Sequence, residues 1–241
     1  MDLGLKGKSV LVTGGSKGIG LACAKAFAAE GCRIHLAARD RERLNAAKKT
    51  LGADTALHAV DLRDPTALRD LARACGDIDI LVNNAGDIPG GTIEALDDAK
   101  WRHAWELKVF GFINLTRELY PRLKSRQGVI VNVIGMAAEH GTFEYICGAT
   151  ANAGLANFTK ALGRGYAQHG VRVVGVHPPA TRTDRIINLM KTQAKAKFGD
   201  ESRYEELMGN VIEPEQVGDT VCFLASARAG QLSGVVLNLG S

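Results

Sequence analysis

The stretch Thr13-Gly14-Gly15-Ser16-Lys17-Gly18-Ile19-Gly20 lies between a short apolar run, residues 9–13, and a longer amphipathic run, residues 19–30. Glycines at the junction of a strand and a helix permit a tight turn and let the backbone approach a phosphate closely. The positive end of the following helix attracts such a group. The stretch therefore predicts a strand–turn–helix unit that holds a phosphate-bearing ligand, and this unit decides the fold.

The same alternation continues along the chain. Strands are expected over residues 9–13, 33–38, 55–60, 80–82, 129–133, 171–176 and 235–239, and helices over residues 19–30, 41–51, 67–75, 97–107, 112–125, 149–169 and 215–225. Parallel strands need crossover connections, and right-handed crossovers place helices on both faces of a sheet. The sequence predicts an α/β fold: a doubly wound, seven-stranded parallel sheet of the Rossmann type.

A single domain is expected over residues 1–241. Residues 178–210 are rich in Lys, Thr and Gln, lack strong periodicity and follow a strand's carboxyl end, where open sheets bind ligands. We predict that they form a substrate lid; the alternative is a surface insertion.

Composition excludes several classes. Hydrophobic residues make up 46% of the chain, which excludes disorder, and no run is long and apolar enough to span a membrane. A net charge of +4 does not indicate nucleic-acid binding. The polar N-terminus predicts no signal peptide, and cytoplasmic location is expected. No disulfide framework or metal site is expected, because the five cysteines show no paired spacing: Cys23, Cys32, Cys75, Cys147 and Cys222.

Further features follow other predicted strands. Asp61-Leu62 comes after the third strand, Asn83-Asn84-Ala85-Gly86 after the fourth and Thr183 after the sixth. Carboxyl ends of parallel strands meet at one edge of the sheet, so these residues are expected beside the glycine-rich turn.

With these motifs the chain resembles the short-chain dehydrogenase/reductase family over essentially its whole length. The family pattern TGxxxGxG matches Thr13–Gly20 and its NNAG matches Asn83–Gly86; residues 155–162 resemble its fifth helix. The resemblance implies a pyridine-dinucleotide oxidoreductase that acts on a carbonyl or alcohol of a small molecule. It also implies a homodimer or homotetramer paired through the fourth and fifth helices. Apolar or small surface is offered there by Phe110, Phe112, Ala153 and Ala156, although each could equally belong to the core.

The resemblance also assigns the cofactor site. Its expected members are Gly14, Ser16, Lys17, Gly18, Ile19, Gly20, Arg39, Asp61, Leu62, Asn84, Ala85, Gly86, Pro178 and Thr183. Ala38 stands where an acidic residue would bind a ribose diol, and Arg39 and Lys17 would flank that ribose. We therefore expect NADP(H) rather than NAD(H), because an arginine suits a 2′-phosphate. The alternative is that Arg39 belongs to the solvated run at residues 39–43.

The family's Asn-Ser-Tyr-Lys catalytic set is absent. Alignment on the flanking motifs puts Lys108 at the asparagine position, Gly135 at the serine position, Gly148 at the tyrosine position and Asn152 at the lysine position. Gly135, Gly148 and Asn152 are expected to line the substrate pocket. Loss of both larger side chains at the glycines predicts either room for a bulkier ligand or a space that Tyr145 fills.

Replacement catalytic groups are sought nearby. Tyr145, Lys108 and His140 are the candidates; the alternatives are that Tyr145 packs at the lid, that Lys108 reaches solvent or a carboxylate, and that His140 is a solvated loop residue. Glu139, Glu144 and His177 are expected in the same region. Three functions stay open: an oxidoreductase with altered acid–base groups, a non-redox enzyme (lyase, hydratase or hydrolase) that uses His140 and Glu144, and a nucleotide-binding protein without chemistry.

Overall fold

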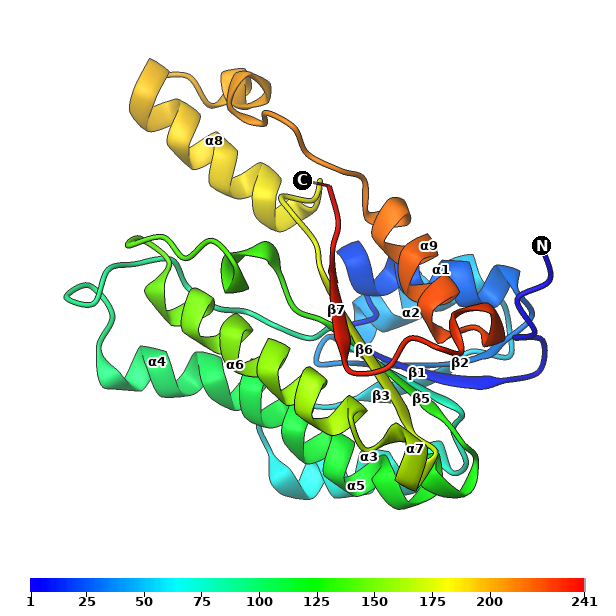
Figure 1. Ribbon diagram of the computed structural model, residues 1–241. Coiled ribbons are helices and arrows are strands. Elements are labelled where there is room, and N and C mark those ends of the chain that lie inside the picture. The colour runs from blue at the N-terminus through cyan, green and yellow to red at the C-terminus, as the bar shows by residue number, and fades with distance from the viewer. Residues whose placement is uncertain (241) are drawn as a thin grey trace.

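Seven parallel strands form one sheet in the computed structural model, which describes residues 1–240 (Figure 1). The order is β3-β2-β1-β4-β5-β6-β7. The strands are β1 (Ser9–Thr13), β2 (Arg33–Ala38), β3 (Ala56–Ala59), β4 (Ile80–Asn83), β5 (Val129–Val133), β6 (Arg172–His177) and β7 (Val235–Asn238). The predicted fold class is confirmed; Ser241 of the predicted domain lies outside the described residues.

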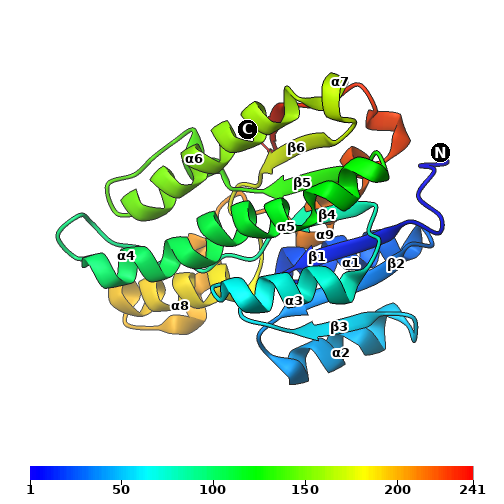
Figure 2. The ribbon, with the colours of Figure 1, turned by 90° about the horizontal axis from the view of Figure 1, so that it is seen from below.

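Helices cover both faces of the sheet (Figures 1 and 2). The α-helices are α1 (Gly18–Ala29), α2 (Arg41–Leu51), α3 (Pro65–Cys75), α4 (Asp98–Trp105), α5 (Gly111–Ser125), α6 (Ile146–Gly163), α7 (Tyr166–His169), α8 (Asp184–Phe198) and α9 (Pro214–Ala225). Helices α1, α2 and α9 share a core with one face of the sheet, and α3 and α5 share a core with the other.

Alternation along the strands builds these two cores. Val10 and Val12 of β1 belong to the core under α1 and α9, whereas Leu11 between them belongs to the core under α3 and α5. Successive side chains of a strand point to opposite faces, so a strand that is apolar throughout is buried on both sides. This explains why the short β-branched runs locate the strands well.

The strand order of the sheet reverses between β1 and β4. The chain builds outward from β1 through β2 to β3, and then returns to place β4 on the other side of β1. The carboxyl ends of β1 and β4 therefore stand side by side with their following loops leading to opposite sides, which is where open α/β sheets bind ligands. The glycine-rich turn and the Asn83–Gly86 turn meet at this point.

Two sequence-based predictions about helices were wrong. The helices expected at 97–107 and 112–125 form one run, because a π-helical turn, η1 (Glu106–Phe110), joins α4 to α5. Residues 178–210 are not aperiodic: they contain the 15-residue helix α8 and the 3-10 helix η3 (Glu201–Leu207), which project from the sheet (Figure 1).

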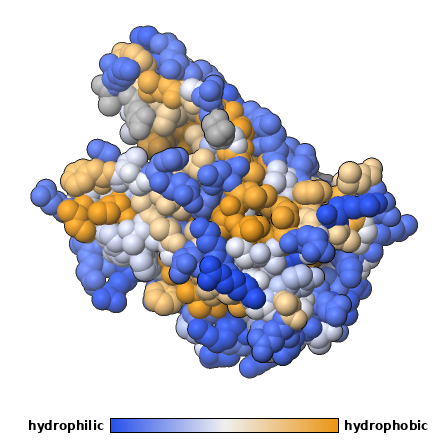
Figure 3. Space-filling model, in the orientation of Figure 1, coloured by the Kyte–Doolittle hydropathy of each residue, from blue (hydrophilic) through white to orange (hydrophobic). Residues whose placement is uncertain are grey.

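Only two of the four residues expected at the subunit surface are exposed. Phe110 is 43% exposed and Ala153 is exposed, but Phe112 and Ala156 are buried and pack in the core that contains Leu155. Figure 3 shows hydrophilic residues over much of one face, with apolar areas between them. No helix within residues 1–240 is long and apolar enough to cross a bilayer.

Asp79 anchors the amino-terminal edge of the sheet. Its buried carboxylate accepts hydrogen bonds from the Ser9 amide at 2.8 Å and from Arg126 at 2.9 Å, and Lys8 Nζ lies 3.6 Å away. Desolvation alone would raise the pKa of Asp79, but the Ser9 amide, Arg126 and Lys8 together lower it. This carboxylate therefore ties the start of β1 to the start of β4 and to the end of α5.

We predict that Asp79→Asn destabilises the protein by about 3 kcal/mol, because a buried acceptor paired with charged donors is lost. That corresponds to a fall in Tm of roughly 6–12 °C. Since the folded pKa is depressed, this contribution is present above the unfolded pKa and is lost as pH falls through the folded one. Denaturant unfolding at neutral pH and below about pH 4 measures it. The exposed Asp77→Asn is the control; an equal effect of both substitutions would refute the assignment.

Candidate functional site

Thr13 and Asn84 lock two turns together at the carboxyl ends of β1 and β4. The Thr13 hydroxyl accepts hydrogen bonds from the amides of Asn84 (2.9 Å) and Ala85 (3.1 Å). In return, Asn84 Nδ2 donates to the Thr13 carbonyl at 3.0 Å. A Cβ built at Gly14, where φ is +64°, would lie 2.9 Å from Asn84 Nδ2, so only glycine permits this approach. Thr13 was quoted in the sequence motif but its organising role was missed.

The N-terminus of α1 is suited to a phosphate. Asp side chains cap α2, α3 and α4, whereas no side chain caps α1 and its first turn has no acidic residue. The first amides of a helix lack partners within the helix, so those of Gly18, Ile19 and Gly20 face the turn with the positive end of the helix dipole. Ser16 and Gly18 are half-buried, and Thr183 Cγ2 lies 3.2 Å from a Cβ built at Gly18. This cradle fits the pyrophosphate of a dinucleotide.

The side expected to hold the adenosine has basic side chains in solvent. Lys17 and Arg39 are exposed, and Arg39 follows Ala38 at the carboxyl end of β2. After β3, the Asp61 carboxylate pairs with Arg63 at 3.1 Å and is 44% exposed, whereas Leu62 is buried against the core under α3. Arg39 is thus placed at a strand end beside the glycine-rich turn.

Residues 178–210 follow β6 and contact the loops at the same end of the sheet. The Pro178 carbonyl accepts a hydrogen bond from Met136 N at 3.1 Å, which joins the loops after β5 and β6. A bridge between Thr181 and Ile212, and ion pairs from Arg182 to Glu205 and Glu213, fix the base of the projection. Arg185 of α8 donates to the Ile88 carbonyl at 2.5 Å, so α8 reaches across to the loop that follows Gly86.

Tyr145 occupies the space beside Gly148, the position where the sequence alignment expected the family's tyrosine. A Cβ built at Gly148 would overlap the Tyr145 ring and lie 2.6 Å from its hydroxyl. The ring also packs on an apolar cluster with Ile88, Leu96 and Cys147. The Tyr145 hydroxyl therefore lies beside the Cβ position of residue 148. The hydroxyl of a tyrosine at position 148 would lie farther out, by the length of its ring. Of the two sequence hypotheses, this geometry favours the space filled by Tyr145.

Asn152 fills the space beside Gly135 in the same way. A Cβ at Gly135, where φ is +131°, would lie 2.9 Å from Asn152 Nδ2, which points to the Gly135 carbonyl at 3.4 Å. Asn152 is buried, and its Oδ1 has no hydrogen-bond partner among the described residues. A buried amide oxygen without a donor is costly in a closed core. It is therefore an acceptor available to a ligand hydroxyl, amide or water.

Lys108 points into the site rather than to solvent or a carboxylate, which corrects the alternative expected for it. It lies in the π-helical turn η1, and its aliphatic chain lies over Gly86, whose built Cβ would be 3.0 Å from Lys108 Cδ. The ammonium donates to the Ile134 carbonyl at 2.6 Å, directly before Gly135. Burial lowers the pKa of Lys108 to about 7, and the nearby Arg185 contributes to the shift. An amine with such a pKa exchanges protons readily near neutrality.

Of the two histidines expected near the site, His140 is exposed and His177 is buried. His140 and Glu144 are both exposed, and no hydrogen bond or ion pair between them occurs in the described part of the chain. His177 at the end of β6 is fully buried, and its Nε2 lies 3.5 Å from Glu139 Oε1. Burial lowers the pKa of His177, while Glu139 opposes that shift. The sequence placed His177 near the site but gave no sign of its pairing with Glu139.

Comparison of the chain with known proteins agrees with this architecture. The family model described as short chain dehydrogenase matches residues 8–194. The chain is 30% identical to a 3-oxoacyl-acyl-carrier-protein reductase of Vibrio cholerae over 245 residues, which cover 98% of this chain and 97% of that protein. It is 31% identical to meso-2,3-butanediol dehydrogenase of Serratia marcescens over 238 residues, covering 94% and 90% of the two chains.

Solved structures show the same fold. L-sorbose reductase from Gluconobacter frateurii, complexed with NADPH and L-sorbose, matches with a TM-score of 0.93 and 31% identity over 99% of this chain and 97% of that one. Actinorhodin polyketide ketoreductase with NADPH matches with a TM-score of 0.90 and 27% identity over 97% and 95% of the two chains.

We predict that Gly148→Ala destabilises the protein by about 1–3 kcal/mol, because the new methyl group overlaps the Tyr145 ring. In the Tyr145→Ala background the same substitution should cost nothing, since the ring is gone. Gly154→Ala on the same helix is the control: nothing lies within 4 Å of its built Cβ, so it should stabilise by about 0.5–1 kcal/mol. Urea unfolding of the four variants measures the coupling, and equal costs in both backgrounds would contradict it.

Proposed function

This chain belongs to the short-chain dehydrogenase family, and from that premise we propose that it is an NADP(H)-dependent oxidoreductase that interconverts a carbonyl and an alcohol on a small molecule, with Lys108 handling the proton. The observation that carries the proposal is the inward-pointing Lys108 ammonium, 2.6 Å from the carbonyl of Ile134, the residue directly before Gly135. The substrate, when bound, would lie between Lys108, Tyr145 and Asn152.

The cofactor fits the cradle described above. The amides at the start of α1 would hold the pyrophosphate, and the Asn84–Gly86 backbone would face the nicotinamide riboside. Lys17 and Arg39, both exposed at the ribose end, support a 2′-phosphate rather than a free diol. Two structural relatives were solved with NADPH. The bound nicotinamide supplies or accepts the hydride.

The chain's own part of the reaction is the movement of a proton at the substrate oxygen. In the reducing direction the Lys108 ammonium donates a proton as negative charge develops on that oxygen; in the oxidising direction the neutral amine accepts it. A pKa of about 7 leaves both forms populated near neutrality. The Ile134 carbonyl holds the amine toward Gly135, where the missing serine would have stood.

Tyr145 and Asn152 shape the pocket in this proposal. The Tyr145 ring closes the space at Gly148 and excludes water from the reacting centre. Asn152 Oδ1, which lacks a donor among the described residues, is available to a substrate hydroxyl. The projection formed by α8 and η3 serves as the lid, since Arg185 ties it to Ile88. Pairing of subunits through α5 and α6 belongs to the proposal, with Phe110 and Ala153 as the exposed contributors.

We predict that Lys108→Met lowers kcat by about 10²- to 10⁴-fold. NADPH absorbance should be followed with L-sorbose, a 3-oxoacyl thioester and 2,3-butanediol, the substrate types named for the relatives. In the native protein, reduction should weaken as pH rises through about 7, because the ammonium is lost, and oxidation should strengthen over the same range. Tyr145→Phe should change kcat little.

Lys124→Met, an exposed lysine on α5, is the matched control and should behave as native. Added primary amines should partly restore Lys108→Ala. A Lys108→Met protein with native kcat and an unchanged pH profile would remove Lys108 from the mechanism. Tight NADPH binding without turnover across the panel would instead favour the nucleotide-binding protein without chemistry, and turnover with no net change in the cofactor would favour the non-redox enzyme.

We predict that Arg39→Asp weakens NADPH binding by about 10- to 100-fold and leaves NADH binding unchanged or improved. The reason is that the substitution removes a guanidinium from the 2′-phosphate and supplies an acceptor for a ribose diol. Fluorescence titration with each nucleotide measures the ratio. Arg41→Asp makes the same charge change on an exposed residue two positions along and should leave the ratio unaltered. A ratio that Arg39→Asp does not move would contradict the NADP(H) preference.

A further inference from the structure

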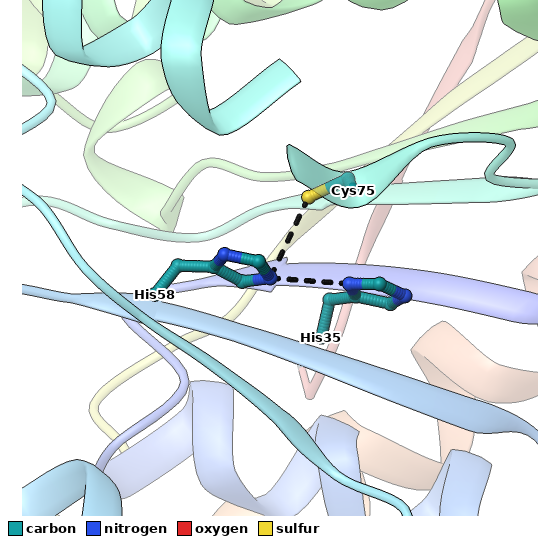
Figure 4. Close-up of side chains that lie close together, drawn as sticks. All are labelled: His35, His58 and Cys75. Atoms are coloured by element: carbon teal, nitrogen blue, oxygen red, sulfur yellow. Dashed lines mark hydrogen bonds between the residues drawn. The ribbon is translucent and has the colours of Figure 1, made fainter. Parts of the chain in front are cut away.

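Three potential metal ligands converge on the face of the sheet under α3 (Figure 4). His35 comes from β2, His58 from the edge strand β3, and Cys75 from the last residue of α3. His35 Nδ1 and His58 Nε2 lie 3.1 Å apart, and Cys75 Sγ lies 3.8 Å from His58 Nε2. All three ligand atoms lie within 4.8 Å of one another.

This cluster is separate from the nucleotide cradle. His35 and His58 are each the third residue of their strands, and Cys75 ends α3 just before the chain enters β4. The glycine-rich turn and Arg39, in contrast, stand at the carboxyl ends. The cluster is also invisible to a search for paired spacing, because its members are 23 and 17 residues apart and meet only through strand pairing and the return of α3.

We propose that His35, His58 and Cys75 bind one Zn²⁺ ion, with water or another outside donor as the fourth ligand. Two imidazole nitrogens and a thiolate are a ligand set that zinc accepts, and a three-residue set leaves one position open. Both histidines are only half-buried, so the open position faces the solvent side of the edge strand. This proposal replaces the sequence-based expectation that the chain has no metal site.

The observed separations are close to those of a tetrahedral site. Zinc–nitrogen bonds of about 2.05 Å and zinc–sulfur bonds of about 2.3 Å place two nitrogens about 3.3 Å apart and a nitrogen and sulfur about 3.6 Å apart. The corresponding distances are 3.1 and 3.8 Å, and the third pair, His35 Nδ1 and Cys75 Sγ, lies within 4.8 Å. The two rings are nearly parallel, with an interplanar angle of 7°, and share a hydrogen bond. Ion entry must break this bond and turn one ring, and His58 on the edge strand is the freer of the two.

At pH 7 both histidine rings are in the neutral form that binds a metal ion, whereas the Cys75 thiol must first lose its proton. Burial and the neighbouring His35 lower the pKa of His58 to about 4, and burial and Arg33 lower that of His35, so both rings are neutral at pH 7. Burial raises the pKa of the Cys75 thiol to about 12, although Arg122 of α5 opposes this. Binding of the ion at Cys75 must therefore displace the thiol proton.

Arg122 holds the third ligand in place. Its guanidinium donates to the carbonyls of Ala72 and Gly76, on either side of Cys75 at the end of α3. These bonds fix the helix end over the two strands and keep a positive charge near the sulfur, which favours its thiolate form. A metal bound here would cross-link β2, β3 and α3.

The test uses tag-free full-length protein with Co²⁺ as a spectroscopic probe and Zn²⁺ as its competitor. Native protein should bind one Co²⁺ with a thiolate-to-cobalt charge-transfer band and the visible bands of tetrahedral cobalt, and Zn²⁺ should remove both. Cys75→Ser should abolish the charge-transfer band, and His58→Gln should weaken Zn²⁺ binding by about tenfold or more in calorimetry. Zn²⁺ at a hundredfold excess over its Kd should raise Tm by roughly 5–10 °C.

Cys32→Ser and His169→Gln, which alter a thiol and a histidine elsewhere, should bind both ions as native protein does. Apo Tm values for all variants separate loss of the site from loss of the fold. Absence of the charge-transfer band in native protein, or a band that survives Cys75→Ser, would overturn the proposal. None of these measurements depends on nucleotide binding or turnover.

Discussion

The interlock between Thr13 and Asn84 is the constraint on which the rest of the site depends. One hydroxyl accepts two amide hydrogen bonds from the turn after β4, and one side-chain amide returns a bond to the turn after β1. These bonds join β1 and β4 at the point where the strand order reverses, and they require glycine at position 14. A nucleotide cradle made of backbone needs such fixing, because backbone amides hold a phosphate well only when their direction is set beforehand.

A buried network of side-chain hydrogen bonds connects the sheet to α6. Asn83 Nδ2 donates to Thr116 and Asn132, and Asn132 Nδ2 donates to Thr159 of α6. Hydrogen bonds in a low-dielectric interior favour one arrangement of the elements they join, although Asn83 Oδ1 has no partner among the described residues. Helix α6 is therefore held in register with β4 and β5. The Tyr145 side chain occupies the room beside Gly148, and the Asn152 side chain occupies the room beside Gly135.

The sequence predicted features that depend on local pattern and missed those that depend on long-range contact. The glycine-rich turn, the seven strands and the fold class follow from glycine chemistry and β-branched runs. The π-helical turn at Glu106–Phe110 has no periodic signature, and the run from α4 to α5 looked like two helices. Helix α8 lies in the Lys-, Thr- and Gln-rich stretch in which no strong periodicity was recognised, and it was missed. Phe112 and Ala156 looked like candidates for an interface because a sequence pattern does not tell which apolar face is covered. The meeting of His35, His58 and Cys75 needs the sheet order itself.

The π-helical turn sets the direction of the Lys108 side chain. Leu107 and Val109 on either side are buried, and the wider turn lets Lys108 point inward with them, which the regular 3.6-residue repeat disfavours. A lysine at this place beside an intact tyrosine–lysine pair would add a second cation to the same pocket, and like charges disfavour each other. With asparagine at position 152 that conflict is absent, and the site regains a positive charge from the opposite wall. In the proposed function, Lys108 therefore supplies from the turn before α5 the positive charge that Asn152 does not supply from α6.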